Sequence, residues 1–200
     1  MKGNRWDDHY TRRARNEKWL ARSVYKLEEI DKRFHLLKRS MRVLDLGCYP
    51  GSWSQYAIKR VGPRGAVFGI DLSRPEGIKS PVFRFLMMDV LNGDIEWPEL
   101  DSGLLDLVLS DMAPPTTGIR TTDECRSLEL AARALELSAY RLKRGGNFIC
   151  KVFEGEDINA FKAKVSACFR NSRLVRPKAT RKRSREVYVL GLGFVAADEQ

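Results

Sequence analysis

Two hundred residues, 43% of them hydrophobic, are enough for one sizeable core, and a second full domain would be cramped. No apolar run approaches the roughly 18 residues of a membrane span, and four widely separated cysteines with two histidines argue against a disulfide framework and a metal site alike. We therefore expect a soluble cytoplasmic protein with reduced thiols, and its net charge of +10 favours a polyanionic partner.

The first elements follow a basic N-terminal segment. Residues 1–15 are polar and aperiodic, so we expect them to be flexible and without regular structure unless a partner is bound. From residue 16 apolar side chains recur at helical spacing, which predicts a helix that ends at Phe34. One folded domain is expected over residues 16–193, with 194–200 as a short tail.

Four apolar segments in the middle of the chain are predicted strands, and each ends in or near an acid. A helix is expected over residues 52–61, between the first strand and the second. Repeated apolar strands, most of them followed by a helix or loop, are typical of a parallel sheet whose functional edge lies at the carboxyl ends of its strands. The four predicted strands are residues 43–46, 66–70, 82–87 and 104–109.

The second half of the chain continues this alternation. A long helix is expected over residues 123–142, stopped by two glycines at 145 and 146, and a shorter helix over residues 158–169. The predicted fold class is α/β, with a mostly parallel seven-stranded sheet flanked by helices. The basic stretch 178–185 joins two strands, so we expect it to be a loop over the site. The last three predicted strands are residues 147–153, 174–176 and 186–192.

The turn after the first strand is the first candidate binding element. Gly47 and Gly51 allow a sharp turn from a buried strand into a helix while a ligand lies against the backbone. The dinucleotide fingerprint requires Gly-x-Gly-x-x-Gly, whereas this turn has Gly-x-x-x-Gly after Asp45, which we expect to organise the turn through backbone amides. The turn therefore predicts a nucleotide-like ligand other than NAD, and a nucleotide-dependent oxidoreductase remains an alternative.

The positive charge gathers at the two ends of the chain. Residues 1–26 carry eight Lys and Arg against three acids, and residues 170–186 carry eight against one, so the other 157 residues sum to about −2. Concentrated positive charge binds the phosphate backbone through counterion release. We expect both basic ends to contact nucleic acid; the alternative is two solvated faces without a partner.

Four further motifs are Asp-Leu-Gly-x-x-Pro-Gly-x-Trp-Ser-Gln-Tyr at 45–56, Leu-Ser-Asp-Met-Ala-Pro at 109–114, Lys-Val-Phe-x-Gly-Glu at 151–156 and Ser-Arg-Glu-Val-Tyr at 184–188. In their order and spacing they resemble the FtsJ/RrmJ family of S-adenosylmethionine-dependent RNA ribose 2′-O-methyltransferases, over about residues 18–193. The resemblance implies a Rossmann-like methyltransferase fold with S-adenosylmethionine as cofactor. The compact chain is similar to bacterial members that modify a uridine of 23S, large-subunit, ribosomal RNA; a transfer-RNA methyltransferase and a non-catalytic RNA-binding or ribosome-assembly protein are the alternatives.

The resemblance also implies a catalytic tetrad of Lys26, Asp111, Lys151 and Glu186. A neutral ribose hydroxyl is a poor nucleophile, so proton removal and alignment are the tasks. A lysine has a reference pKa of about 10.4, and burial beside another cation is needed before it can accept a proton. Lys151, inside an apolar strand, is the expected base, and Lys26 would supply the neighbouring charge. Asp111 and Glu186 would orient the lysines.

Cofactor contacts are expected at the strand ends. Asp71 is positioned to accept hydrogen bonds from the ribose hydroxyls, and Asp89 to meet the adenine edge. Gly47 and Gly51 would let the backbone approach the cofactor, and Trp53 resembles the family's cofactor-contacting tryptophan. Asp111 is expected to face the cofactor as well as the lysines.

The glycine turn departs from the family's pattern at three positions. Cys48 and Tyr49 stand where small residues are usual, and Ser52 replaces a second glycine. A tyrosine at this bend would either narrow the cofactor pocket or point toward RNA.

Overall fold

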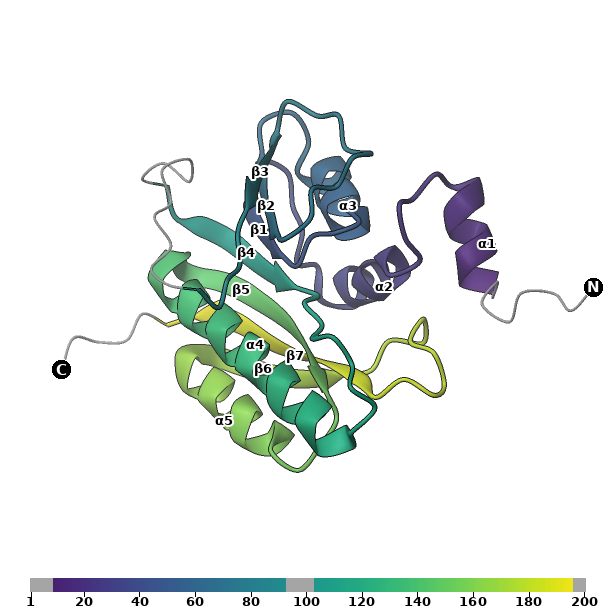
Figure 1. Ribbon diagram of the computed structural model, residues 1–200. Helices are drawn as coiled ribbons and strands as arrows, with labels where there is room; N and C mark the ends of the chain where they lie inside the picture. The colour runs from purple at the N-terminus through teal and green to yellow at the C-terminus, as the bar shows by residue number, and fades with distance from the viewer. Residues whose placement is uncertain (1–8, 93–102, 196–200) are drawn as a thin grey trace, which may run out of the picture.

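The computed structural model describes residues 9–92 and 103–195. Its centre is a seven-stranded sheet with the order β3-β2-β1-β4-β5-β7-β6 (Figure 1). The predicted α/β class and mostly parallel sheet are confirmed. The strands are β1 (Arg42–Leu46), β2 (Ala66–Asp71), β3 (Phe83–Met87), β4 (Leu105–Ser110), β5 (Leu142–Phe153), β6 (Phe169–Val175) and β7 (Glu186–Phe194).

The sheet changes winding direction between β1 and β4. The five strands from β3 to β5 pair in parallel, and β7 pairs antiparallel with both β5 and β6. The chain runs outward from β1 through β2 to β3 and then returns to β4 on the other side of β1. In open α/β sheets, ligands bind outside the carboxyl ends of the strands at such a switch point. The topology therefore predicts a ligand site at the carboxyl ends of β1 and β4.

Helices cover both faces of the sheet. Helices α2 (Val24–Phe34) and α3 (Ser52–Val61) lie over one face, and α4 (Arg120–Arg141) and α5 (Ile158–Cys168) over the other (Figure 1). Each face has its own buried cluster, represented by Leu27 and Ala57 on the first and by Ala131 and Val165 on the second. Burial of each large side chain stabilises the fold by about 1.5–3 kcal/mol, which holds the strand ends in a fixed register.

The N-terminal segment is more regular than its sequence predicts. Residues His9–Asn16 form helix α1, so the expectation of no regular structure is wrong for residues 9–15; residues 1–8 lie outside the described part of the chain. The Tyr10 ring packs 5.4 Å from the ring of Tyr25 on α2, and the guanidinium of Arg13 lies 4.3 Å from the centre of the Tyr25 ring. These contacts with α2 stabilise a helix that its own polar sequence does not favour.

Several element boundaries also differ from the prediction. The helix expected from residue 16 begins only at Val24, because the chain turns at Lys18, which has a φ of 61°. Helix α4 ends at Arg141, and β5 begins at the next residue, Leu142. The two glycines that were expected to separate the helix from the strand therefore lie within β5. Strand β6 has seven residues where three were expected, and β7 continues to Phe194.

Among the described helices, none combines the length and the apolar character needed to cross a bilayer.

Candidate active site

The carboxyl ends of β1, β2 and β4 meet at the glycine turn. Gly47 has a φ of 72°, and a Cβ atom built on it would lie 2.6 Å from Cγ and 2.8 Å from Cα of Met112, just after β4. The amides of Gly47 and Cys48 both donate to the carbonyl of Ile70 on β2, at 2.9 and 3.2 Å. Only glycine at position 47 lets the three strand ends approach this closely.

A cavity of about 270 Å³ opens at this junction. We call it the acidic cavity, because three carboxylates line it, those of Asp71, Asp89 and Asp111, and its lining holds no Lys or Arg among the residues described. Such a surface suits a ligand that carries positive charge on a partly apolar body. Its other lining residues are Gly47, Tyr49, Ile70, Leu72, Met88, Val90, Met112, Ala113 and Leu130.

Two of the three carboxylates are held in place by backbone amides. One oxygen of Asp71 accepts from the amide of Tyr49 and the other from the amide of Ser73, both at 2.9 Å. Asp89 accepts from the amide of Leu91 at 3.0 Å. A carboxylate oxygen has two lone pairs, so each of these groups can still accept hydrogen bonds from a ligand. The predicted cofactor acids therefore do line one cavity.

Gly51 and Trp53 do not line the acidic cavity. Gly51 has a φ of 115°, and a Cβ atom there would lie 2.8 Å from side-chain atoms of Ile78 and Leu20. The Trp53 indole is buried, donates its N–H to the carbonyl of Ser23 at 2.9 Å and packs against another ring in the core. Both residues shape the start of α3, and no direct cofactor contact follows from their positions. Of the three departures from the family pattern, Tyr49 is 58% exposed at the cavity, whereas Cys48 and Ser52 are buried.

Asp45 lies fully buried under the glycine turn. Its Oδ2 accepts from the hydroxyl of Ser54 on α3 at 2.6 Å, and within the described residues its Oδ1 has no hydrogen-bond partner. Burial raises the pKa of Asp45 to about 7; the charges of Asp111 and Asp71 add to the rise, and the Ser54 hydrogen bond opposes it. The backbone of Ser54 also interacts with this carboxylate, so Asp45 is anchored to the start of α3 by both the hydroxyl and the main chain of Ser54.

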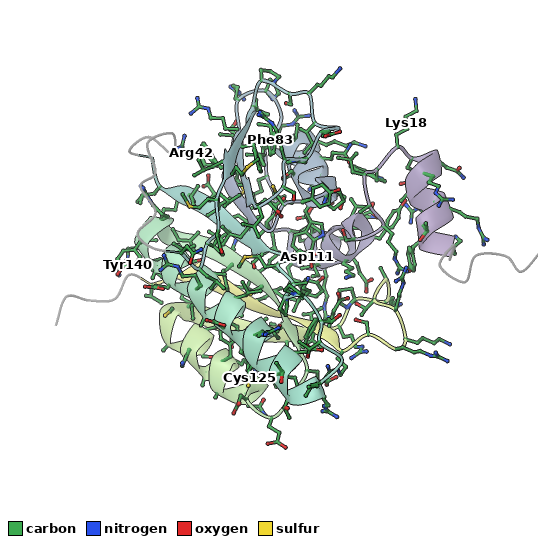
Figure 2. The ribbon with its side chains drawn as sticks, viewed as in Figure 1. Lys18, Arg42, Phe83, Asp111, Cys125 and Tyr140 are labelled. Atoms are coloured by element: carbon green, nitrogen blue, oxygen red, sulfur yellow. The ribbon has the colours of Figure 1, made fainter. Side chains whose placement is uncertain are left out.

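Lys151 and Asp111 form the first pair of the tetrad. Lys151 points from β5 into the interior, with 5% of its surface exposed. Its Nζ donates to the backbone carbonyl of Asp111 at 2.5 Å and lies 3.3 Å from Oδ1 of the same residue. Asp111 follows β4 and lies near the middle of the molecule (Figure 2). The pair therefore stands at the inner wall of the acidic cavity, which Asp111 lines.

Lys26 and Glu186 form the second pair. Nζ of Lys26, in the first turn of α2, donates to Oε2 of Glu186, the first residue of β7, at 2.7 Å. Burial acts to raise the pKa of Glu186, but the positive charge of Lys26, its hydrogen bond and the charge of Lys151 outweigh it, so the pKa lies below its usual 4.5. The two pairs are thus close enough to interact.

Tyr188 joins the two pairs, and the sequence analysis did not single it out. It lies opposite Lys151 in the β5–β7 register, and its hydroxyl donates to Oδ1 of Asp111 at 2.8 Å. Burial, followed by the charges of Asp111 and Glu186, raises its pKa well above 10, so the phenol stays a neutral donor. A buried tyrosine needs a hydrogen-bond partner for its hydroxyl. The presence of a tyrosine inside an apolar strand was therefore the feature of the sequence that could have pointed to Tyr188.

A second cavity, also about 270 Å³, lies on the other side of the pairs. We call it the basic cavity; it is lined by Arg22, Ser23, Lys26, Arg181, Ser184 and Glu186. One wall is the start of α2 and the other is the β6–β7 loop, which the sequence placed over the site and which does border this cavity. The Arg22 guanidinium donates to the carbonyl of Ala179, and the carboxylate of Glu29 accepts from the amide of Lys178 at 2.8 Å. These bonds hold the loop against α2.

The acidic cavity distinguishes between the enzyme classes that use such a sheet. Three carboxylates would repel the diphosphate of NAD, so the oxidoreductase alternative does not fit. Within residues 9–92 and 103–195, no group of three or more His, Cys, Asp or Glu side chains could hold a metal ion. The fold and the cavity are those of a Rossmann-like methyltransferase. More narrowly, the chain belongs to the FtsJ-like methyltransferase family, whose sequence model matches residues 19–194.

Close relatives cover almost the whole chain. A protein of Desulfosudis oleivorans named ribosomal RNA large subunit methyltransferase E is 47% identical over 190 residues, which is 95% of this chain and 92% of the relative. A protein of the same name from Bdellovibrio bacteriovorus is 44% identical, over 92% of this chain and 95% of the relative. The crystal structure of a Plasmodium falciparum protein described as a ribosomal RNA methyltransferase matches with a TM-score of 0.79 and 27% identity, over 90% of this chain and all of that one.

Proposed function

We propose that this protein transfers a methyl group from S-adenosylmethionine to the ribose 2′-hydroxyl of a uridine in 23S ribosomal RNA of the large subunit. The observation that carries the proposal is the meeting of two cavities of opposite charge at the Lys151–Asp111 and Lys26–Glu186 pairs. The names of the relatives support ribosomal RNA as the substrate class.

The acidic cavity fits the cofactor in charge and chemistry. When bound, S-adenosylmethionine supplies a methyl group on a positively charged sulfur. Asp71 and Asp89 keep lone pairs that can accept hydrogen bonds from the ribose and the adenine, and Asp111 adds negative charge at the inner wall. Gly47 keeps the turn clear of the cavity. Gly51 and Trp53 act indirectly, by fixing the start of α3.

Lys151 is the proposed general base. Its Nζ is buried and held by two oxygens of Asp111, so it is positioned before the RNA arrives. The neutral amine keeps an N–H that donates to the Asp111 carbonyl, and its lone pair takes the proton of the 2′-hydroxyl. Lys26 contributes the neighbouring positive charge, and Glu186 and Asp111 orient the two lysines. In-line alignment and proton removal together make the hydroxyl a competent nucleophile.

The basic cavity is the proposed entry for the RNA strand. Arg22, Lys26 and Arg181 place three positive charges around it, against the single carboxylate of Glu186. The basic ends of the chain, residues 1–26 and 170–186, would contact phosphates on either side, within the large ribosomal subunit. We also propose a cytoplasmic location, where the protein would meet a ribosomal substrate.

A transfer assay tests the proposal directly. Purified protein is incubated with labelled S-adenosylmethionine and with large subunits or 23S ribosomal RNA that lack the mark, and 2′-O-methyl groups are then mapped. Label on one uridine of 23S ribosomal RNA is the expected result. Label on transfer RNA alone would establish the transfer-RNA alternative. Cofactor binding by calorimetry with no transfer to any RNA would establish the non-catalytic one, and NAD binding without S-adenosylmethionine binding would overturn the cofactor.

A further inference from the structure

Ser52 makes a contact that a glycine at its position could not. Its hydroxyl lies 2.8 Å from the hydroxyl of Ser23, the residue that precedes α2. The neighbouring Trp53 donates its indole N–H to the carbonyl of the same Ser23 at 2.9 Å. Ser23 makes no side-chain hydrogen bond to its own helix, so its hydroxyl is directed at α3 instead of capping α2. We call these two bonds from α3 to Ser23 the serine clasp.

The clasp leads directly to Lys26. The Ser23 carbonyl that accepts from Trp53 also accepts the amide of Lys26, at 3.0 Å. Ser23 and Lys26 are three residues apart, on one face of the first turn of α2, and both line the basic cavity. A shift of Ser23 therefore moves Lys26, and with it the hydrogen bond from Lys26 to Glu186.

The other end of the clasp is fixed to the acidic cavity. Ser52 follows the glycine turn by one residue and stands three residues after Tyr49, which lines that cavity. The side chains of Leu20 and Ile78 pack so close to Gly51 that a Cβ atom there would lie 2.8 Å from each of them. Ser52 and Trp53 are each 2% exposed, so water cannot readily replace their hydrogen bonds. The clasp thus connects one wall of each cavity.

We propose that Ser52 is a positioning residue for methyl transfer: through Ser23 it sets Lys26, and hence the Lys26–Glu186 pair, relative to the turn of the acidic cavity. The inference rests on the proposed function of the tetrad. Ser52 itself lines neither cavity, so it acts through other residues and touches neither substrate. Misplacement of a catalytic group by about 1 Å can cost about 100-fold in rate, so a small shift of α2 is enough to be measured.

Ser52→Ala, Ser23→Ala and the double variant test this role. Each single variant should lower kcat by about tenfold. The double variant should be no slower than either one, because both remove the same hydroxyl pair. KM for RNA and cofactor affinity should stay within about twofold in Ser52→Ala. The matched control is Ser166→Ala, which breaks another hydroxyl pair, the 2.6 Å contact between Ser166 and Ser172, on the opposite face of the sheet; its kcat should not change.

The outcomes separate this inference from the function on which it rests. Thermal unfolding by circular dichroism confirms that every variant is folded at the assay temperature. An active wild-type chain whose Ser52→Ala variant keeps its kcat, or loses only RNA affinity, would overturn the positioning role. If the effects of the two substitutions on kcat were additive in the double variant, Ser52 would not act through Ser23, and the inference would be overturned. A wild-type chain that binds the cofactor but methylates no RNA would overturn the proposed function, and the role of Ser52 with it.

Discussion

The acidic and basic cavities have the same volume, about 270 Å³ each, and differ in charge. The acidic cavity is built at the ends of parallel strands, where main-chain hydrogen bonds hold the ends of β1, β2 and β4 together. The basic cavity is built outside the parallel part of the sheet, from the first turn of α2 and the β6–β7 loop. The linings differ in charge, and under the proposed function this difference separates a cationic cofactor from polyanionic RNA.

In the proposed mechanism, the reaction takes place at the two Lys–carboxylate pairs between the cavities. Asp111 belongs to the acidic cavity and Glu186 to the basic one, and each carboxylate forms an ion pair with one lysine. Tyr188 donates to Asp111 from the strand that carries Glu186. Three kinds of variant therefore test the difference between the cavities. The first removes a residue of the Lys–carboxylate pairs, the second changes the charge of one cavity alone, and the third changes the pH dependence of stability.

The largest effect is expected at the junction, from Lys151→Ala. Removal of the proposed base should lower kcat by at least about 1,000-fold, because proton transfer and alignment are removed together. Calorimetry should show cofactor affinity within a few-fold of wild type, since Lys151 does not line the acidic cavity. Lys164→Ala, on the exposed side of α5, is the control and should be fully active. Full activity of Lys151→Ala would remove Lys151 as the base.

A smaller, one-sided effect is expected from Asp71→Asn. This change keeps the shape of the side chain but removes one of the three negative charges of the acidic cavity. Loss of a charged acceptor should weaken cofactor binding by about tenfold or more, as measured by calorimetry, while RNA affinity stays unchanged. Asp157→Asn, an exposed carboxylate before α5, serves as the control. Weaker RNA binding with unchanged cofactor binding would contradict the assignment of the cofactor to the acidic cavity and of RNA to the basic cavity.

The elements that form the acidic cavity were predicted more accurately than the edge of the sheet and the N-terminal helix. Strands β1, β2 and β4 are buried on both faces, so they read as continuous apolar runs, and their ends were predicted to within one residue. Strand β6 lies at the edge of the sheet and is mostly exposed. Its exposed polar residues break the apolar pattern of a strand, so more than half of its length was not predicted. Helix α1 depends on contacts with Tyr25, which no local pattern reveals.

At the site, the motifs predicted positions but not partners. All four tetrad residues lie together, and Asp71 and Asp89 line the predicted cavity. Which lysine binds which carboxylate depends on the register of β5 and β7 and on the fold of α2, and is therefore a property of the packed molecule. Trp53 shows the limit most clearly, because its indole faces Ser23 and the core.

The basic cavity can be weakened alone by charge reversal in its loop. Replacing Arg181, Lys182 and Arg183 by glutamate should weaken RNA binding and flatten its salt dependence, by about 0.7–0.9 in the log–log slope for each phosphate that the loop no longer neutralises. Cofactor affinity should not change. The same reversal at Arg126, Lys162 and Lys164, on the helices of the opposite face, matches the change in net charge. An equal effect of both triple variants would show that only net charge matters.

The smallest effect, with opposite signs for the two cavities, is expected in the pH dependence of stability. Asp45, under the acidic cavity, has a folded-state pKa of about 7 against an ordinary 3.8, so the folded state holds its proton more tightly. Its contribution to the free energy of unfolding therefore falls as pH rises from about 4 to about 7, by at most about 1.4 kcal/mol per pH unit. In urea titrations, Asp45→Asn should show a shallower loss of stability than wild type over this range.

Glu186, in the basic cavity, should behave in the opposite way. Its folded-state pKa lies below 4.5, so its stabilising contribution is complete above that pH and is lost as pH falls through the folded-state pKa. Glu186→Gln should thus be less stable than wild type at pH 7, where Lys26 loses its charged partner, and this deficit should shrink toward pH 4. If Asp45→Asn and Glu186→Gln changed the pH profile in the same direction, the burial of Asp45 and the ion pair of Glu186 would not set these two pKa values. Changes of opposite sign, measured without any ligand, would show that a carboxylate buried without a cation and a carboxylate paired with Lys26 contribute to stability in opposite ways as pH changes.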